Sequence, residues 1–254
     1  MNVASDYRDS HTAVGKGKVY HSSFSQYSWR RIMWEWEQRT LVEIFEEKLP
    51  KDGTIMDFAC GTGRILNFLQ TQSPNVTGVD ISDSMLEVTR KNLPNIEIVQ
   101  ADLTRDNVLK EANRQFDVIT SFRFFLKAQN ELRIEVLDTL HPLLKEHGTF
   151  VVNNHGPAMS LGVLLEIFYG RLKNLIRTPE KKVTFYRMSH KHFKKLLNNA
   201  GFEIETTYHR SVFPIMNEKT PRDVSKFEKF ENWCSTKKFL RPLARNVVYV
   251  CKKK

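Results

Sequence analysis

The sequence has few cysteines and no long apolar run. Its three cysteines, Cys60, Cys234 and Cys251, are odd in number and far apart, which excludes a disulfide framework and a zinc knuckle. No stretch approaches the roughly 20 apolar residues of a membrane-spanning helix. Residues 1–18 are polar and lack the apolar centre of a secretory signal. We therefore expect a cytoplasmic location.

Acidic residues are scarce in the last two-fifths of the chain. Residues 156–254 carry 21 basic and eight acidic side chains, so the formal net charge of +10 originates there. An electrostatic field of this sign favours an acidic small molecule, a nucleic acid or an anionic membrane surface. A solvated lysine-rich face would give the same count and needs no partner.

Short apolar runs alternate with helix-like segments up to residue 155. We expect strands at 54–58, 75–81, 95–103, 116–122 and 149–155, and helices from residue 64, at 82–92 and at 131–147, the last ended by Gly148. This alternation predicts right-handed βαβ units and a doubly wound α/β fold with a mostly parallel sheet. Beyond it, the pattern predicts helices at 158–177 and 189–202, strands at 203–213 and 245–253, and a charged insertion at 214–244.

The stretch DFACGTGR (residues 57–64) joins the first predicted strand to a helix. Strand, glycine-rich turn and helix together bring backbone N–H groups close to a ligand. Gly61 and Gly63 permit the tight turn. Leu66 occupies the place of the third glycine of the dinucleotide fingerprint, which argues against NAD or FAD. A P-loop is excluded because no Gly-Lys-Ser/Thr follows.

Two carboxylates end the next two strands. Asp80 lies 23 residues after Asp57, close to the roughly 20 residues at which an acidic side chain binds a ribose diol in this fold. Asp102 ends the third strand, where it can accept hydrogen bonds from an adenine edge. A ligand with an adenine, a ribose diol and no pyrophosphate fits these features.

The ordered set IMDFACGTGRIL, VTGVDISDSML, IEIVQADL and FDVITSF resembles the class I S-adenosylmethionine-dependent methyltransferases, in their small-molecule type, over residues 50–155. The resemblance implies a Rossmann-like, seven-stranded sheet with a helical cap. In the family's pattern Asp57, Ala59, Cys60, Gly61 and Gly63 belong to the cofactor-binding loop, and Ala59, Gly61 and Gly63 approach the methionine part of S-adenosylmethionine. Ala59 is a tolerated variant of the family's first glycine.

The resemblance also assigns the remaining cofactor contacts. Asp80 holds the ribose hydroxyls, and Phe122 lines the site of methyl transfer. The residues expected around the adenine are Ile81, Met85, Asp102 and the backbone of Leu103. The alternative for the carboxylates is that they only cap turns.

The resemblance divides the chain into residues 1–40, a helical segment that closes over the cofactor, and a methyltransferase domain at 41–254. Tyr27 and either Arg30 or Arg31, of which we choose Arg31, are the cofactor contacts expected from the first part. Residues 1–25 are expected to be loosely ordered on their own. Cap insertions are expected at about 156–188 and 214–244. The helix at 158–177 would cover the acceptor site, or alternatively lie on an anionic membrane surface.

Acceptor chemistry is predicted from the strand ends. His155 ends the fifth strand, where it can serve as general base, or simply cap the strand. Arg123, at the neighbouring strand end, can bind an acidic substrate or form a surface ion pair. No carboxylate lies there to hold a metal ion, so none is expected. We therefore predict methyl transfer to an oxygen of a small-molecule or glycan-like acidic acceptor. RNA is an alternative acceptor, although no RNA-binding module or stacking platform is visible, and a non-catalytic scaffold is a third possibility.

Overall fold

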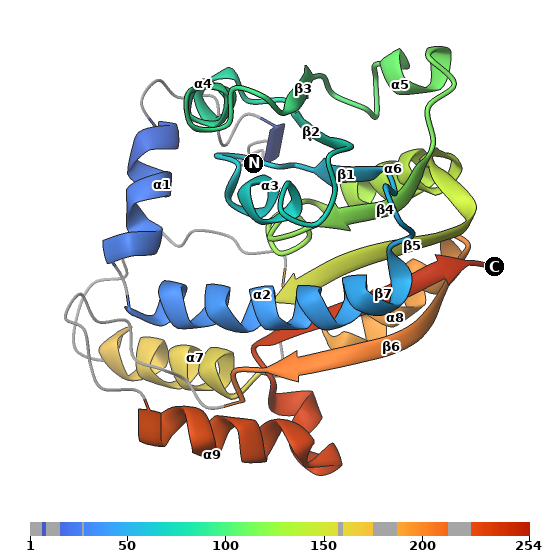
Figure 1. Cartoon of the computed structure of the whole chain (residues 1–254). Coiled ribbons are helices and arrows are strands. Elements are labelled where there is room, and N and C mark those ends of the chain that lie inside the picture. Colours follow the sequence, from blue (N-terminus) through green and yellow to red (C-terminus); the bar gives the residue numbers. More distant parts are fainter. Residues whose placement is uncertain (1–6, 9–15, 27, 157–159, 175–186, 213–224) are drawn as a thin grey trace, which may run out of the picture.

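The computed structural model describes residues 7–8, 16–26, 28–156, 160–174, 187–212 and 225–254. Within these ranges, seven strands form one sheet of order β3-β2-β1-β4-β5-β7-β6 (Figure 1). The predicted α/β fold with a seven-stranded sheet is confirmed. The strands are β1 (Ile55–Phe58), β2 (Val76–Asp80), β3 (Glu97–Gln100), β4 (Phe116–Ser121), β5 (Leu144–His155), β6 (Phe202–Arg210) and β7 (Asn246–Lys253).

Strand direction brings two distant parts of the chain together at one edge of the sheet. Strands β1 to β5 pair in parallel, whereas β7 lies antiparallel between β5 and β6. Because β7 runs the opposite way, its first residue, Asn246, lies opposite His155, the last residue of β5. The carboxyl ends of β1, β2, β4 and β5 therefore meet the start of β7, at the edge where ligands bind in this class of sheet.

Helices cover both faces of the sheet. In Figure 1, α2 and α3 lie in front of it, and α6 and α8 lie behind. The helices are α1 (Lys16–Gln26), α2 (Ser28–Lys48), α3 (Arg64–Leu69), α4 (Asp83–Asn92), α5 (Val108–Glu111), α6 (Asn130–Leu143), α7 (Leu161–Asn174), α8 (His190–Asn199), α9 (Ser225–Thr236) and the 3-10 helix η2 (Lys238–Leu243).

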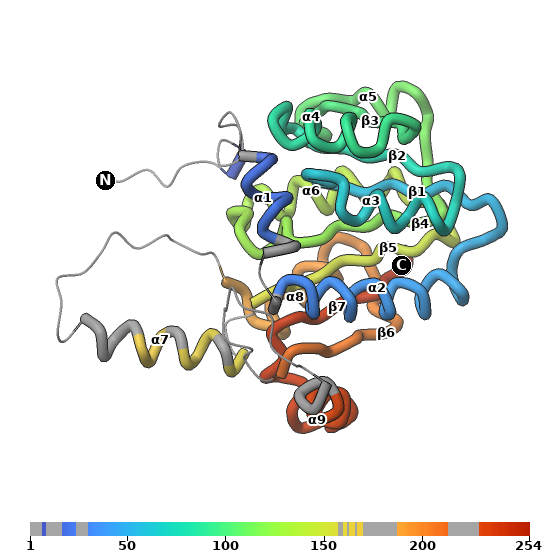
Figure 2. The backbone as a smooth tube through the Cα atoms, turned by 60° about the vertical axis from the view of Figure 1, so that its left-hand side comes forward, coloured from blue at the N-terminus to red at the C-terminus, as the bar shows by residue number. Residues whose placement is uncertain are grey.

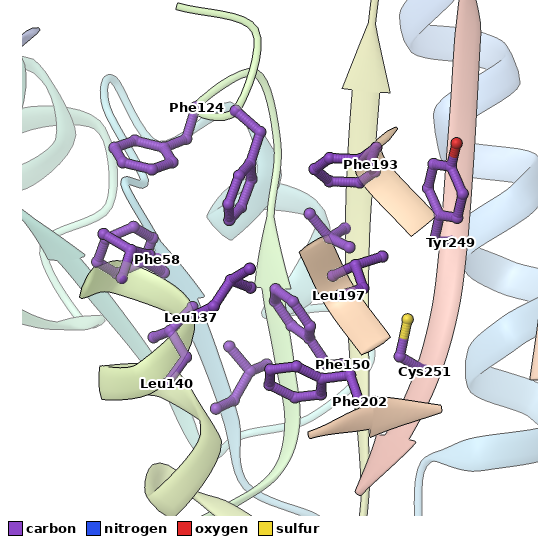
Figure 3. Close-up of a cluster of buried hydrophobic side chains, with 14 of the residues drawn as sticks. Phe58, Phe124, Leu137, Leu140, Phe150, Phe193, Leu197, Phe202, Tyr249 and Cys251 are labelled. Atoms are coloured by element: carbon purple, nitrogen blue, oxygen red, sulfur yellow. The ribbon is translucent and has the colours of Figure 1, made fainter. Parts of the chain in front are cut away.

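Each face has its own apolar core. Behind the sheet, Leu137 and Leu140 of α6 and Leu197 of α8 pack with Phe150 and Phe202 of the strands (Figure 3). In front, the apolar side of α2 packs with α3, α4 and the sheet through a cluster that includes Leu41, Ile44, Phe45, Leu66 and Leu86. Each such buried side chain contributes about 1.5–3 kcal/mol. The second cluster fixes α2 against the sheet and so places the polar residues of α2 near the ligand edge.

One predicted boundary is wrong. The helix expected to run to residue 147 ends at Leu143, and β5 begins at Leu144. Leu144 is fully buried and pairs with Phe116 of β4, so tertiary burial overrides the helical pattern. Gly148 therefore lies within β5 and does not end a helix. A Cβ at this position would lie 2.8 Å from the Leu144 side chain and 3.0 Å from the carbonyl oxygen of Asp117.

The predicted helix at 158–177 is found as α7, which extends away from the sheet (Figure 2). Its apolar stripe was expected to cover the acceptor site, but the side chains of Leu164, Leu165 and Phe168 are exposed. Val163, which lies off that stripe, is buried. In the part of the chain that the structure describes, no helix is long and apolar enough to cross a membrane.

Candidate active site

The loop between β1 and α3 turns through three residues in the left-handed region. Ala59, Gly61 and Gly63 have φ angles of 57°, 59° and 78°. Glycine adopts this conformation without strain, whereas alanine pays about 1–2 kcal/mol. The N–H of Gly63 donates to the carbonyl of Cys60 at 3.1 Å and closes the turn. The glycine-rich sequence thus bends the chain sharply at the carboxyl end of β1.

The two glycines of this loop serve different purposes. Gly61 lines a cavity, and a Cβ built on it meets no heavy atom within 4 Å. A Cβ on Gly63 would lie 2.9 Å from the side chains of both Leu93 and Thr89. Gly61 therefore leaves space for a ligand, whereas Gly63 permits close packing of the loop on α4.

Asp80 ties the end of β2 to this loop. One carboxylate oxygen accepts the N–H of Gly61 and the other accepts the N–H of Ser82, both at 2.8 Å. Burial raises the pKa of Asp80, and these backbone hydrogen bonds partly oppose the rise. Each oxygen retains lone pairs that can accept from a diol.

Two adjoining cavities open at this edge of the sheet, with volumes of about 350 and 60 Å³. Tyr7, Ala59 and Phe124 line both. The smaller cavity also includes Ile81, Asp102 and Leu103, which the sequence assigned to the adenine. The larger cavity includes Gly61, Met85, Phe122, Arg123 and His155. Nine predicted site residues, Ala59 included, thus line these two adjoining cavities.

Four residues predicted to contact the cofactor, Asp57, Cys60, Gly63 and Asp80, are not among the residues that line either cavity. Asp57 is buried and accepts the hydroxyl of Thr120 at 2.6 Å through one oxygen. Its other oxygen, Oδ2, has no hydrogen-bond partner among the described residues. Burial raises the pKa of Asp57 to about 7.

The N-terminal part contributes different residues from those predicted. Arg31 is about half exposed and lies 3.8 Å from Glu35 of the same helix. Its neighbour Arg30 lines the larger cavity instead, since successive residues of a helix point about 100° apart. Tyr27 lies outside the described residues.

The sequence analysis did not identify Tyr7 and Arg8. The ring of Tyr7 packs edge-on against Phe124, with centroids 5.4 Å apart. The Arg8 guanidinium donates to Asp102 at 2.7 Å and to Thr104 at 2.7 Å. Burial alone would raise the pKa of Asp102, but the hydrogen bonds from Thr104 and Arg8 lower it. This segment thus lies directly against the cavity expected to hold the adenine.

Glu37 of α2 forms the centre of a buried polar network. Its carboxylate accepts from Arg64 at 2.8 Å, from Arg123 at 3.1 Å and from Asn246 at 3.0 Å. Burial alone would raise the pKa of Glu37, but the charges of Arg123 and Arg64 lower it. The ionised carboxylate joins α2 to the start of α3, the end of β4 and the start of β7.

Arg123 is held by its backbone as well as by its side chain. Its φ of 67° lies in the left-handed region, which is strained for a residue with a Cβ. Its N–H donates to the Asn153 side chain at 2.7 Å, and Asn153 in turn donates to Asn246 at 3.0 Å. Two neighbouring strands therefore fix the direction in which this guanidinium enters the cavity.

His155 lies in a strongly cationic environment. It is 5% exposed and lines the larger cavity. Burial lowers its pKa well below the ordinary value, and the charges of Arg123, Arg245 and Arg30 lower it further. Its imidazole is therefore neutral at pH 7, the form in which histidine accepts a proton.

We expect Glu37→Gln to lower the free energy of unfolding by about 3–5 kcal/mol, because it leaves Arg64 and Arg123 without their buried counter-charge. Chemical denaturation measures the change. Glu35→Gln is the matched control, since Glu35 lies on the same helix, is 47% exposed and pairs with Arg31. It should change the stability by less than about 1 kcal/mol. Equal stabilities for the two variants would contradict the central role of Glu37.

Comparison with known proteins agrees with this geometry. Residues 55–148 match the family model described as a methyltransferase domain. The chain is 32% identical over 103 residues to dTDP-4-amino-2,3,4,6-tetradeoxy-D-glucose N,N-dimethyltransferase of Saccharopolyspora spinosa, a match that covers 39% of this chain and 40% of that protein. It is 31% identical over 126 residues to malonyl-(acyl-carrier protein) O-methyltransferase of Halalkalibacterium halodurans, which covers 46% of each.

The matches therefore span less than half the length of these relatives. Among solved structures, magnesium protoporphyrin IX methyltransferase of Synechocystis with bound S-adenosylhomocysteine superimposes with a TM-score of 0.57 at 15% identity, over 86% of this chain and 84% of that one. A likeness at this identity concerns the fold. Residues 55–148 therefore form a methyltransferase domain, of the class I S-adenosylmethionine-dependent type.

Proposed function

We propose that this protein transfers the methyl group of S-adenosylmethionine to an oxygen atom of a small-molecule or glycan-like acidic acceptor bound in the larger cavity. The observation that carries the proposal is the charge of that cavity. Its described lining includes Arg30, Arg123, Lys127, Arg187 and Arg245, and no Asp or Glu. The volume of about 350 Å³ lies within the range of small-molecule sites.

The residues present fit the cofactor. Gly61 provides the open surface on which a ligand can approach the backbone. Asp80 ends β2, Asp102 follows the adjacent strand β3, and both carboxylates accept hydrogen bonds, as a ribose diol and an adenine amine require. Asp57 Oδ2 lies buried behind the loop without a described hydrogen-bond partner. When bound, the cofactor supplies the electrophilic methyl group.

The cavity charge also favours oxygen as the methylated atom. The named relatives include both an N,N-dimethyltransferase and an O-methyltransferase, so likeness alone does not choose between them. An amine acceptor is a cation at neutral pH, and the guanidinium groups around His155 would repel it. A hydroxyl is neutral, and the guanidinium groups would attract an acidic group elsewhere in the same acceptor molecule.

His155 is the proposed general base. The imidazole would take the hydroxyl proton of the acceptor while the acceptor oxygen bonds to the methyl carbon; the methyl–sulfur bond would break, and its electron pair would leave the cofactor as a neutral thioether. The depressed pKa makes the free imidazole a weak base. A negatively charged acceptor beside it offsets the guanidinium charges and raises that pKa toward neutrality. The proton acceptor is thus strengthened only when the acidic acceptor is in place.

The first test uses S-adenosylmethionine that carries a labelled methyl group, incubated with the protein and a cell extract. Label should appear in a small acidic metabolite or glycan fraction that binds an anion-exchange resin. Each labelled product is then identified by mass spectrometry. Label confined to RNA would instead support the nucleic-acid alternative, and no transfer at all would favour the non-catalytic scaffold.

Cofactor binding should distinguish the two loop glycines. Gly61→Ala places a methyl group in the cavity, so we expect the dissociation constant for S-adenosylmethionine to rise at least tenfold, measured by calorimetry. Gly63→Ala should mainly reduce stability, because its Cβ would collide with Leu93 and Thr89. Similar cofactor affinities for the wild type and Gly61→Ala would show that the cofactor does not contact Gly61.

Removal of the base should separate catalysis from cofactor binding. We expect His155→Ala to reduce turnover by about 10²–10⁴, while cofactor affinity stays within about twofold. Because the pKa of His155 is depressed in the free enzyme, the apparent pKa of the acid limb of the kcat/KM profile should lie below 6.5, the ordinary value for histidine. Near-normal turnover in the variant would mean that the acceptor needs no base from His155.

A further inference from the structure

The basic side chains of the larger cavity come from four separate parts of the chain. Arg30 lies on α2, Arg123 and Lys127 follow β4, Arg187 precedes α8, and Arg245 precedes β7. Such convergence from distant segments differs from a solvated lysine-rich helix face, where the charges share one element. The fold therefore concentrates positive charge at the site where the acceptor is proposed to bind.

Two of these guanidinium groups are held in place by described contacts. Arg123 is fixed through Glu37 and through its backbone bond to Asn153. Arg30 donates to the hydroxyl of Ser23 and lies over the ring of Tyr20, 5.6 Å from the centroid. Fixed guanidinium groups bind an oxyanion without losing side-chain entropy at the moment of binding.

The number of charges exceeds what one carboxylate requires. The cofactor's own carboxylate matches a single positive charge, whereas five basic side chains line the cavity, one of which, Arg123, is already paired with Glu37. One guanidinium group can donate two parallel hydrogen bonds to two phosphate oxygens. A phosphate monoester carries about −1.5 to −2 charges on three free oxygens at pH 7. A planar carboxylate offers two oxygens and one charge. Several guanidinium groups arriving from different elements suit a tetrahedral dianion better.

We propose that the cationic cluster of Arg30, Arg123, Arg187 and Arg245 binds a phosphate or diphosphate group of the acceptor. This inference rests on the proposed function, since it names the acidic group of the acceptor. The phosphate stays unchanged in the reaction and orients a hydroxyl elsewhere in the same molecule toward His155. The phosphate belongs either to a soluble ester or to a lipid-linked one, and both share this chemistry.

The test uses inorganic phosphate and pyrophosphate as probes, so it does not require the acceptor. Calorimetry at constant ionic strength should show pyrophosphate binding to the wild type, whereas acetate at ten times the concentration should not bind. Arg30→Gln and Arg245→Gln should each weaken pyrophosphate binding at least tenfold. The matched control is Arg31→Gln, which removes the same charge one residue away, outside the cavity, and should stay within twofold.

Equal pyrophosphate affinity in all variants, or equal binding of acetate, would overturn the proposal. Each variant must also bind S-adenosylmethionine, which shows that it is folded. The labelled-methyl transfer is measured independently. Transfer without specific pyrophosphate binding would refute only this inference, and absence of transfer would refute the proposed function.

A sedimentation arm distinguishes the two sources of the phosphate. Vesicles containing phosphatidic acid should sediment the wild type, and pyrophosphate should release it, if the phosphate is lipid-linked. Sedimentation should fail, with pyrophosphate binding intact, if the phosphate belongs to a soluble ester. Both results support the phosphate site and assign its source.

Discussion

The carboxylate of Glu37 is the interaction on which the arrangement of this site depends. An ionised group in the interior is costly unless it is paired and hydrogen-bonded, and Glu37 meets this condition with Arg64, Arg123 and Asn246. These partners lie at the helix after the cofactor loop, at the end of β4 and at the start of β7. One buried charge thus fixes the relative positions of the cofactor loop and the acceptor cavity.

The N-terminal part is also held by buried and partly buried polar contacts. Helix α2 is anchored by its apolar side and by Glu37, which brings Arg30 of the same helix to the cavity. Farther upstream, Arg8 pairs with Asp102 at 2.7 Å. The N-terminal segment is therefore attached at two polar points, one for each cavity, and both attachments use carboxylates near the ligand edge.

Sequence reasoning predicted the fold correctly where the signal is local or follows from strand direction. Gly61 lies in the turn after β1, Asp80 ends β2 and Asp102 follows β3, because strand ends and turn residues are recognisable within a few positions, and a parallel sheet brings those ends together. Their contacts with the cofactor stay a prediction. It failed where the signal is tertiary. Glu37 and Asn246 are 209 residues apart, so no local pattern connects them. The sequence analysis chose Arg31, whereas Arg30 lines the cavity, because a shift of one residue rotates a helical side chain by about 100°.

The guanidinium groups of the larger cavity act both on His155 and on any charged molecule that enters. Arg123, Arg245 and Arg30 depress the pKa of His155, which alone would make it a poor base. In the proposed function the same charges attract an anionic acceptor, and that anion weakens their effect on the imidazole. The proposal thus links binding of the acidic group to activation of the base through one set of guanidinium groups. A neutral or cationic molecule that entered the cavity would leave His155 with its depressed pKa, so under this proposal the charge of the acceptor would both select the substrate and enable proton removal.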